Sequence, residues 1–393
     1  MDFQDTPEQA AFREEVRTFI ENERPREYDP DKGMQGGEER APRDAPWYKR
    51  WQGKLSERGW IAPAWPKEYG GASLGVMEQF IMNEEFAEAR VPPSSIGNGV
   101  SMLGPTIIAH GSEAQQEEHL GRMLRGEVIW CQGYSEPGSG SDLASLQTRA
   151  IRDGDDYVIN GQKIWTSGAH YSDWIFMLAR TDPDAPKHRG ISYFLLDMKT
   201  PGITVRPLVN MASLHNFNEV FFEDVRVPAE NIVGEVNRGW YVGATTLDFE
   251  RSSIGSAVAH RQTLERYLDY WRENADGVSN PEGVREALAE RWIEAATAKM
   301  LSYRVIGMQA AGEIPNAEAS IAKMFSTELS QRIAGTAIKM LGTAGILNGG
   351  EKAPFEGRLG AAYVASVSAT IAGGTSEIQR NIIATRGLGL PRA

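Results

Sequence analysis

The spacing of hydrophobic residues changes twice along this chain of 393 residues. In the first third, apolar residues recur at helical spacing, as at Phe12, Val16 and Phe19. From about Gly126 the apolar runs shorten to the length of strands and alternate with turn dipeptides. After Pro228 the helical spacing returns and persists. We therefore expect an α+β chain.

The two changes of spacing divide the chain into three predicted domains. Residues 1–125 form a helical domain, residues 126–233 a β domain and residues 234–393 a second helical domain. Periodicity alone predicts no finer architecture than this order.

Local helix signals mark both outer domains. Thr6-Pro7-Glu8-Gln9 matches a capping box with proline at the first helical position. In the last domain, long helices are predicted over 240–274, 282–311 and 316–341, and a further helix begins near Thr375.

Turn and strand signals crowd the β domain. Asp153-Gly154 and Asn160-Gly161 are both typical of hairpin turns. Buried strands are predicted at 174–178 and 191–196, where apolar residues dominate. The single cysteine, Cys131, excludes an internal disulfide, fits a reducing compartment and is interpreted as a buried strand thiol.

Composition narrows the classes of function. The net charge of −12 argues against nucleic-acid binding, which needs a basic surface. No apolar run approaches the ~18 residues of a membrane span, and the N-terminus lacks the features of a secretory signal. The six histidines show no ligand spacing, so no metal is expected. We expect a soluble, cytoplasmic protein.

Two segments of the β domain carry chemically useful residues. The turn 134–142 (YSEPGSGSD) has glycines two apart, which let backbone N–H groups approach a planar or anionic ligand. About twenty residues later, 163–168 (KIWTSG) carries an aromatic ring at Trp165 and two neighbouring hydroxyls. Taken singly, the first is an ordinary polar turn and the second a strand with a core tryptophan.

Together with 373–380 (GGTSEIQR), these segments resemble the flavin site of the acyl-CoA dehydrogenase family in order, spacing and residue type. The resemblance extends through 68–71 (EYGG), 222–228 (FEDVRVP) and the C-terminal helices, so it covers nearly the whole chain. It implies an N-terminal α-helical domain, a middle β-barrel domain and a C-terminal four-helix bundle. It also implies FAD as the cofactor and an acyl-CoA thioester as the substrate.

The resemblance assigns flavin contacts to the middle domain. Tyr134 and Ser135 would hold the pyrimidine edge of the flavin. Trp165 would cover the isoalloxazine ring beside the hydroxyl of Thr166. The Ser167 hydroxyl would donate to N5, where the hydride arrives and a donor stabilises the developing charge.

Further contacts follow from the resemblance. Ser141 would serve both cofactor and substrate, at the thioester region or pantetheine. Gly374, Thr375 and Glu377 match positions that hold the adenosine part of FAD, at a helix N-terminus where phosphate is favoured.

The catalytic base is the main departure. Many family members place a glutamate just before the Gly-Thr pair, where this chain has Gly373. Members resembling isovaleryl and long-chain enzymes supply the carboxylate from the first long helix of the C-terminal domain instead. Glu250 matches that relocated base, with Asp248 and Arg251 beside it as substrate contacts.

If the resemblance to the family is set aside, Glu250-Arg251 is interpreted as a charged patch near the start of a helix. The paired change at Gly373 favours Glu250 as the base that removes the α-proton. The backbone N–H of Gly373 and a flavin ribityl hydroxyl would then polarise the thioester carbonyl, so that Gly373 remains a substrate contact.

A second departure concerns contacts between subunits. Family members usually reach the neighbour's flavin pyrophosphate through an Arg-x-Thr/x-Phe-Gly motif, but 270–278 (YWRENADGV) has no Phe-Gly. The stretch 339–345 (KMLGTAG) matches a second such contact only loosely. Either a paralogous subunit supplies the contacts, as in heterotetramers resembling bacterial steroid side-chain dehydrogenases, or a homodimer or homotetramer closes the site differently.

Three functions remain open from sequence. The leading one is an FAD-dependent acyl-CoA dehydrogenase of lipid metabolism and fatty acid β-oxidation that passes electrons to an electron-transferring flavoprotein. The second is a non-catalytic or half-site subunit of a heteromeric dehydrogenase. The third is a flavin oxidase or monooxygenase. Acyl chain length stays open, although Gly99, Ser101 and Met102 are predicted to line the acyl end.

Overall fold

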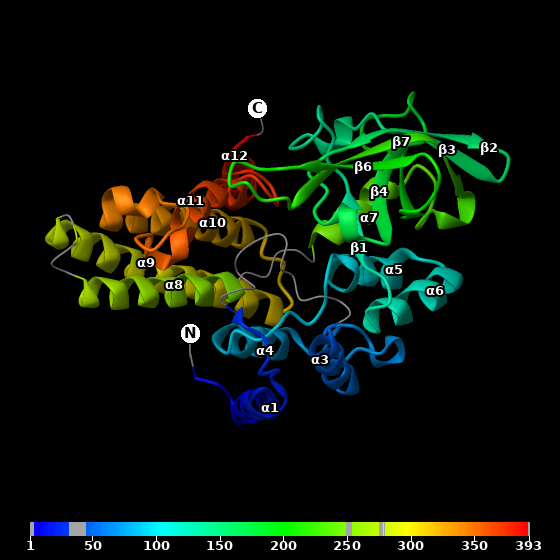
Figure 1. Ribbon diagram of the computed structural model, residues 1–393. Coiled ribbons are helices and arrows are strands. Elements are labelled where there is room, and N and C mark those ends of the chain that lie inside the picture. Colours follow the sequence, from blue (N-terminus) through cyan, green and yellow to red (C-terminus); the bar gives the residue numbers. More distant parts are fainter. Residues whose placement is uncertain (1–3, 31–44, 249–253, 275–277, 279, 392–393) are drawn as a thin grey trace.

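The computed structural model describes residues 4–30, 45–248, 254–274, 278 and 280–391 (Figure 1). Helices come first, a sheet follows, and helices return. In Figure 1 the C-terminal helices lie at the left, the sheet at the upper right and the N-terminal helices below. The predicted α+β class and the order of its parts are confirmed. The boundaries at 125/126 and 233/234 stay a prediction.

The N-terminal helices enclose a core rich in aromatic side chains. They are α1 (Pro7–Glu23), α3 (Pro46–Glu57), α4 (Val76–Glu88), α5 (Gly104–His110) and α6 (Glu113–Leu124), with a π-helical turn η2 (Gly99–Leu103) leading into α5. The predicted capping box is confirmed, because Thr6 Oγ1 accepts a hydrogen bond from the backbone N–H of Gln9 (3.3 Å) and the Gln9 side chain accepts from Thr6.

The middle domain is one mixed, seven-stranded half-barrel sheet. Its strands are β1 (Trp130–Gly133), β2 (Arg149–Asp153), β3 (Asp156–Lys163), β4 (Trp174–Arg180), β5 (Ile191–Asp197), β6 (Ile203–Leu208) and β7 (Phe217–Pro228). The order is β1-β4-β2-β3-β7-β6, and β5 pairs with β4. The strand β4 runs parallel to β1 and β2, and the other pairs are antiparallel.

The two predicted hairpin turns have different outcomes. Asp153-Gly154 begins the turn that joins β2 to β3, as expected. The prediction for Asn160-Gly161 is wrong, because both residues lie inside β3, where the register against β7 shifts. Gly161 has φ +152°, and a Cβ there would lie 2.5 Å from the Thr148 hydroxyl oxygen. The glycine therefore serves a bulge in a crowded strand.

The sheet buries both faces. Cys131, Ile175 and Phe194 belong to one core, whereas Trp130 and Tyr193 belong to another that is shared with the N-terminal helices. Cys131 is fully buried, as predicted, and burial raises the pKa of its thiol to about 12. The thiol is therefore neutral near pH 7, which suits a structural role.

The C-terminal domain contains α7 (Gly239–Asp248), α8 (Ile254–Glu273), α9 (Pro281–Ala310), α10 (Asn316–Leu341), α11 (Arg358–Ala369) and α12 (Ser376–Ile382). The helices α8 to α11 form the four-helix bundle that was expected, with Leu264, Leu288, Leu329 and Leu359 in its core. The helices predicted at 282–311 and 316–341 match α9 and α10 to within one residue. Within the predicted helix 240–274, the structure describes α7 and α8.

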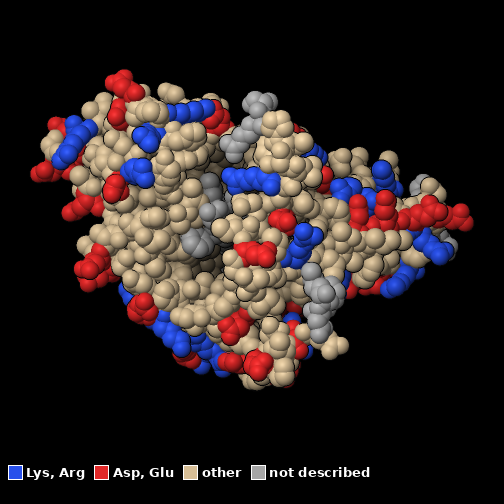
Figure 2. Space-filling view, turned by 180° about the vertical axis from the view of Figure 1, so that it is seen from behind, with Lys and Arg blue, Asp and Glu red and all other residues tan. Residues whose placement is uncertain are grey.

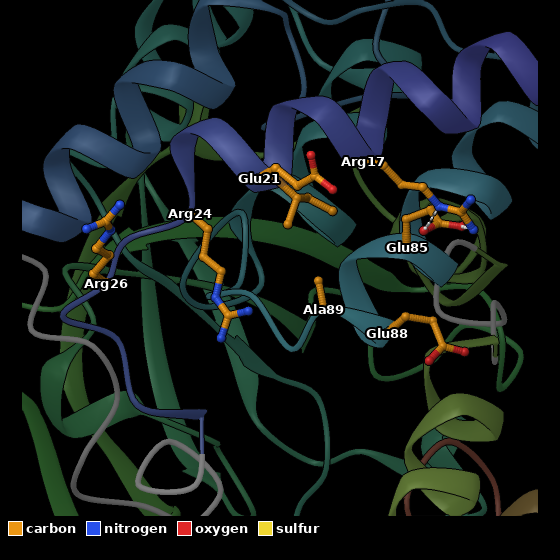
Figure 3. Close-up of a pocket in the computed structure, with 8 residues that line it drawn as sticks. Arg17, Glu21, Arg24, Arg26, Glu85, Glu88 and Ala89 are labelled. Atoms are coloured by element: carbon orange, nitrogen blue, oxygen red, sulfur yellow. Dashed lines mark hydrogen bonds and ion pairs between the residues drawn. The ribbon is translucent and has the colours of Figure 1, made fainter.

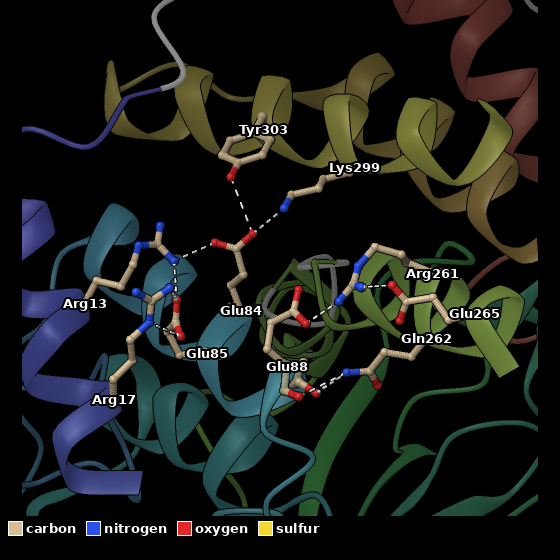
Figure 4. A network of polar contacts seen from close by, with 11 residues as sticks. Arg13, Arg17, Glu84, Glu85, Glu88, Arg261, Gln262, Glu265, Lys299 and Tyr303 are labelled. Carbon is tan, nitrogen blue, oxygen red and sulfur yellow. Dashed lines mark hydrogen bonds and ion pairs between the residues drawn. The ribbon is translucent and has the colours of Figure 1, made fainter. Parts of the chain in front are cut away.

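One helix joins the two helical domains (Figure 4). Glu84 of α4 accepts a hydrogen bond from Arg13 of α1 (2.8 Å) and is 2.8 Å from Lys299 Nζ of α9. Burial acts to raise the pKa of Glu84, but its bonds to Lys299 and Arg13 outweigh burial and hold the pKa below its ordinary value. Glu88, at the end of the same helix, pairs with Arg261 of α8. The helix α4 is therefore an ionic link between domains.

Acidic and basic side chains interleave over the described part of the face in Figure 2. Within the described ranges, no helix combines the length and apolar character that crossing a membrane requires.

Candidate functional site

The turn 134–142 follows β1 and is held by a buried carboxylate. Glu136 and Ser139 exchange backbone hydrogen bonds of 2.8 and 3.0 Å, which close the turn. The Glu136 carboxylate accepts from the backbone N–H groups of Gln147 (2.6 Å) and Thr148 (3.0 Å). At Gly138 and Gly140 a Cβ would meet nothing within 4 Å, so packing inside the chain does not require these glycines.

The segment 163–168 is joined directly to this turn. The backbone N–H of Ile164 donates to the Ser135 carbonyl (2.9 Å), and Lys163 Nζ donates to the Tyr134 carbonyl (3.2 Å) and to Glu136 (2.7 Å). The structure therefore brings together the two motifs that the sequence placed about twenty residues apart.

The Lys163–Glu136 pair is buried, and burial changes its titration. Burial lowers the pKa of Lys163 to about 8, although the charge of Glu136 opposes this change. Burial also acts to raise the pKa of Glu136, but the charge of Lys163 and the backbone donors outweigh it and lower that pKa. Removing either partner would leave a buried charge in the frame of the site.

Trp165 has an unusual backbone. Its φ is +59°, a left-handed value that bulky residues rarely adopt and that costs about 1–3 kcal/mol. The ring is 54% exposed and meets Phe217 edge-on at 5.9 Å. The structure therefore holds an exposed indole in a strained conformation, which points to a functional role.

The residues after Trp165 are fixed by the start of β7. Thr166 N–H donates to the Asn218 carbonyl (3.1 Å), and the Asn218 side chain donates to the Thr166 carbonyl (3.0 Å). Thr166 Oγ1 is buried and has no hydrogen-bond partner among the described residues, whereas Ser167 is exposed. A buried unpaired hydroxyl beside an exposed indole fits a flat aromatic cofactor with polar edges.

The Tyr134 side chain points away from this surface. It is buried, its ring meets Phe176 and Tyr193 edge-on, and its hydroxyl interacts with that of Tyr193. Tyr193 Oη in turn lies 3.4 Å from Thr246 Oγ1 of α7, which is 2.9 Å from Thr106 Oγ1 of α5. A ligand at the turn would therefore meet the backbone of Tyr134 rather than its ring.

The helix α7 packs beside Tyr134. At Gly243 a Cβ would lie 3.4 Å from the Tyr134 hydroxyl, so a small residue suits this contact. Asp248 ends α7. Glu250 and Arg251, the predicted base and its neighbour, lie outside the described residues.

The Gly-Gly-Thr segment caps α12. Gly373 and Gly374 have φ +62° and +87°, and their carbonyls accept from Gln379 Nε2 (3.0 Å) and Lys323 Nζ (2.7 Å), respectively. Thr375 Oγ1 accepts from Ile378 N–H at 3.2 Å, which makes Thr375 the N-cap. These hydrogen bonds stay within the C-terminal domain.

The predicted site residues therefore form two groups. Tyr134, Ser135, Trp165, Thr166 and Ser167 are held together in the middle domain, and Ser141 is exposed farther along the same turn. Gly373, Gly374, Thr375 and Glu377 form the second group at the start of α12. Glu377 is exposed there.

A separate groove of about 520 Å³ lies on the N-terminal domain, between α1 and α4 (Figure 3). Its lining includes Arg17, Arg24 and Arg26 together with Glu85 and Glu88. None of the predicted site residues lines it, so we assign it no part in the chemistry.

Sequence reasoning missed the residues that hold the site in place. Lys163 and Glu136 were quoted only as members of motifs, and Asn218 was not identified. A lysine two residues before Trp165 and an asparagine inside 217–222 (FNEVFF) were the available signals. Both are buried polar side chains that pair across long sequence distances.

Family models of three domains match the chain, one after another along the sequence. Their descriptions are acyl-CoA dehydrogenase N-terminal domain at residues 6–127, middle domain at 131–225 and C-terminal domain at 237–388. Acyl-CoA dehydrogenase IpdE1 of Mycobacterium tuberculosis is 37% identical over 97% of this chain and 97% of its own length. FadE29 of the same organism is 35% identical over 98% of each.

Solved structures agree with these relatives. The Tcur3481-Tcur3483 steroid ACAD matches 100% of both chains with a TM-score of 0.84 and 31% identity. The ChsE4-ChsE5 complex from Mycobacterium tuberculosis also matches 100% of both chains, with a TM-score of 0.83 and 34% identity.

Proposed function

Because the chain belongs to the acyl-CoA dehydrogenase family of oxidoreductases, we propose that it uses FAD to dehydrogenate an acyl-CoA thioester between its α and β carbons. The observation that carries the proposal is the junction of the two middle-domain motifs. The Ile164–Ser135 hydrogen bond and the buried Lys163–Glu136 pair hold them together beside the strained Trp165.

The chain's own residues would prepare the substrate and move its proton. Glu250 would remove the α-proton, and the Gly373 N–H would polarise the thioester carbonyl. A free glutamate titrates near pH 4.3, whereas a base suited to neutral pH titrates at roughly 6–7. A dry pocket around Glu250 would supply that rise of about two units, or roughly 3 kcal/mol.

The remaining site residues would bind and orient the cofactor. Bound FAD supplies the hydride acceptor. Trp165 would cover the ring, Ser167 would donate a hydrogen bond to its N5 atom, and the backbone of Tyr134 and Ser135 would hold its polar edge. Thr375, as the N-cap of α12, would face the adenosine part together with Gly374 and Glu377.

For the substrate, we propose a bulky acyl-CoA of the steroid-derived class. Two observations support this choice. A full-length match is a solved steroid ACAD. In addition, the base is assigned to Glu250 rather than to position 373. In this respect the chain resembles family members that act on branched, long or bulky acyl groups.

We also propose that the chain works in an oligomer and passes electrons to an electron-transferring flavoprotein. Two full-length structural matches are complexes of two named chains, Tcur3481-Tcur3483 and ChsE4-ChsE5. The motif that would reach a neighbour's flavin is absent from 270–278. This absence favours a second candidate function, a half-site subunit that needs a paralogous chain for a complete FAD site.

Flavin content and flavin bleaching together test these proposals. The purified chain is assayed for FAD per chain and is then mixed anaerobically with short, long, branched and steroid-side-chain CoA esters. We expect bleaching that is fastest with the steroid-side-chain esters. Flavin binding without bleaching by any ester would overturn the proposed dehydrogenase. FAD that binds only after a paralogous chain is added would select the half-site subunit.

A further inference from the structure

We propose that Asn218 is a positioning residue that fixes the peptide groups of Trp165, Thr166 and Ser167, and through them the surroundings of the flavin ring. The identity of the ligand rests on the proposed function. The conformation of the segment does not, because it follows from contacts within the chain.

Asn218 holds Thr166 from both sides of the residue. Its backbone carbonyl accepts from Thr166 N–H at 3.1 Å, and its side-chain Nδ2 donates to the Thr166 carbonyl at 3.0 Å. Asn218 is 0% exposed, so water does not compete for these bonds. One residue of β7 therefore satisfies both polar groups of Thr166.

This double contact accounts for the strained tryptophan. Trp165, with φ +59°, lies between two anchored neighbours, Ile164 bound to Ser135 and Thr166 bound to Asn218. A left-handed tryptophan persists only where its surroundings over-determine the backbone. Without the Asn218 side chain, only one backbone bond would hold Thr166 to β7.

The Thr166 carbonyl fixes the orientation of the Asn218 amide, and two histidines complete its hydrogen bonds. The Thr166 carbonyl can only accept, so Nδ2 must face it. The second proton of Nδ2 then faces His170 Nδ1 (3.1 Å), and Oδ1 faces His215 Nε2 (2.9 Å). The two imidazole rings stack with their centroids 4.1 Å apart. The amide is fully hydrogen-bonded, and an aspartate of the same shape would lack both donors.

The consequence reaches the predicted hydrogen bond to flavin N5. Ser167 follows Thr166 directly, so the direction of its hydroxyl depends on the peptide that Asn218 holds. A change at Asn218 should therefore alter the cofactor's environment although Asn218 itself need not touch the cofactor. Substrate binding should change much less.

The test compares Asn218→Asp with wild type and with a control, Asn160→Ala. The control removes an asparagine of β3 that bonds to Asp224 of β7, and it leaves 165–168 untouched. In the protein as isolated, hydrogen–deuterium exchange is measured over residues 164–170. The FAD dissociation constant and the circular dichroism and reduction potential of bound flavin are measured alongside. Initial bleaching rates are recorded against acyl-CoA concentration.

For Asn218→Asp we expect faster exchange over 164–170, weaker FAD binding and a changed flavin dichroism. Bleaching should slow by roughly 10- to 100-fold, the cost of a small misplacement, with little change in KM. Asn160→Ala should match wild type. Should Asn218→Asp fail to fold, His215→Leu replaces it and should change the same readouts in the same direction by less.

Wild-type exchange, flavin dichroism and potential in the Asn218→Asp protein, or in His215→Leu as its substitute, would overturn the inference. One other outcome would overturn only the proposed function. If no acyl-CoA ester bleaches the wild-type flavin while exchange still rises in Asn218→Asp, Asn218 positions the segment but the chain is not the proposed dehydrogenase.

Discussion

Trp165 combines two properties that rarely occur together in one tryptophan. Its backbone is left-handed, and about half of its surface faces solvent. Neither property stabilises the fold. Backbone strain costs stability, and an aromatic ring that stays exposed contributes little hydrophobic free energy. The residue is best explained by a ligand that the indole contacts.

Replacing Trp165 by glycine should therefore cost little stability. Glycine adopts φ +59° freely, so relief of about 1–3 kcal/mol of strain should offset the packing that is lost. We expect the free energy of unfolding to fall by less than about 2 kcal/mol, while FAD affinity falls by at least tenfold. Urea unfolding and flavin titration measure the two quantities.

Trp130 supplies the matched control, because its side chain is almost fully buried. Trp130→Ala should cost about 3–5 kcal/mol, as expected for a buried aromatic ring. Equal losses at the two positions, or unchanged FAD affinity in Trp165→Gly, would contradict a ligand-contacting role for Trp165.

Lys163 makes a pH prediction whose sign can be worked out. The pKa is about 8 in the folded protein and 10.5 as the ordinary value of the unfolded chain. Between these values the unfolded state binds more protons, so stability rises with pH. The destabilisation from burying the charge is fully present below pH 8 and is relieved as pH rises to 10.5.

From pH 8 to 10 this group should add on the order of 2 kcal/mol to the free energy of unfolding. Urea unfolding across this range measures the change in wild type and in Lys163→Met, which lacks the titrating group. A wild-type slope no steeper than that of Lys163→Met would show that Lys163 does not titrate in this window.

At the scale of helices and strands, local signals predicted what local contacts decide. Thr6 caps α1 through Gln9, three residues away, and the Asp153-Gly154 turn joins neighbouring strands. The dipeptide Asn160-Gly161 has the same local signature, but its surroundings come from β7, some sixty residues later. Sequence periodicity cannot detect that pairing, so the dipeptide was predicted to be a hairpin turn, whereas it lies inside a strand.

The candidate site shows the same difference between local signals and long-range contacts. Trp165 and Ser167 could be named because they belong to short motifs with recognisable spacing. The contacts that hold them could not, because Lys163 reaches Glu136 across 27 positions and Asn218 reaches Thr166 across 52. Their partners follow from how the strands fold together. Nothing in the described residues tests the assignment of Glu250.

The link through α4 gives a prediction for helix packing. Glu84 is 4% exposed and bonds to α1 and α9 at once. We expect Glu84→Gln to lower the free energy of unfolding by about 2 kcal/mol, because it removes the carboxylate bonded to the half-buried Lys299 and one of three carboxylates bonded to Arg13. Urea unfolding measures this change.

A matched substitution separates burial from charge. Glu15→Gln breaks the pair of Glu15 with Arg58, in which both side chains are about half exposed. It should cost less than about 1 kcal/mol. Similar, small losses for Glu84→Gln and Glu15→Gln would mean that α4 does not couple the two helical domains.

At the scale of the whole molecule, α11 leaves apolar surface unburied. Tyr363 and Val367 lie one turn apart on α11, Ile371 follows its end, and each is 47–59% exposed. A stripe of this kind suits contact with another subunit. Cross-subunit contacts matter here because 270–278 lacks the Phe-Gly through which family members usually reach the flavin of the neighbouring subunit.

We expect Val367→Glu to dissociate the proposed oligomer, because a carboxylate would be buried without a partner at the contact. Light scattering after size-exclusion chromatography measures the mass. Ile151→Glu, on an exposed position of β2, is the control and should leave the mass unchanged. An unchanged mass for Val367→Glu would place the subunit contact elsewhere.

Glu250, which follows α7 in the sequence, is proposed to supply the carboxylate that is missing at Gly373. Anaerobic stopped-flow bleaching by a reactive acyl-CoA ester tests it in wild type, Glu250→Gln and Glu273→Gln, which changes an exposed glutamate at the end of α8. Loss of a general base costs typically 10²–10⁴-fold in rate. We expect such a loss in Glu250→Gln, with FAD content unchanged and wild-type rates in Glu273→Gln. Bleaching by Glu250→Gln at the wild-type rate would contradict the account.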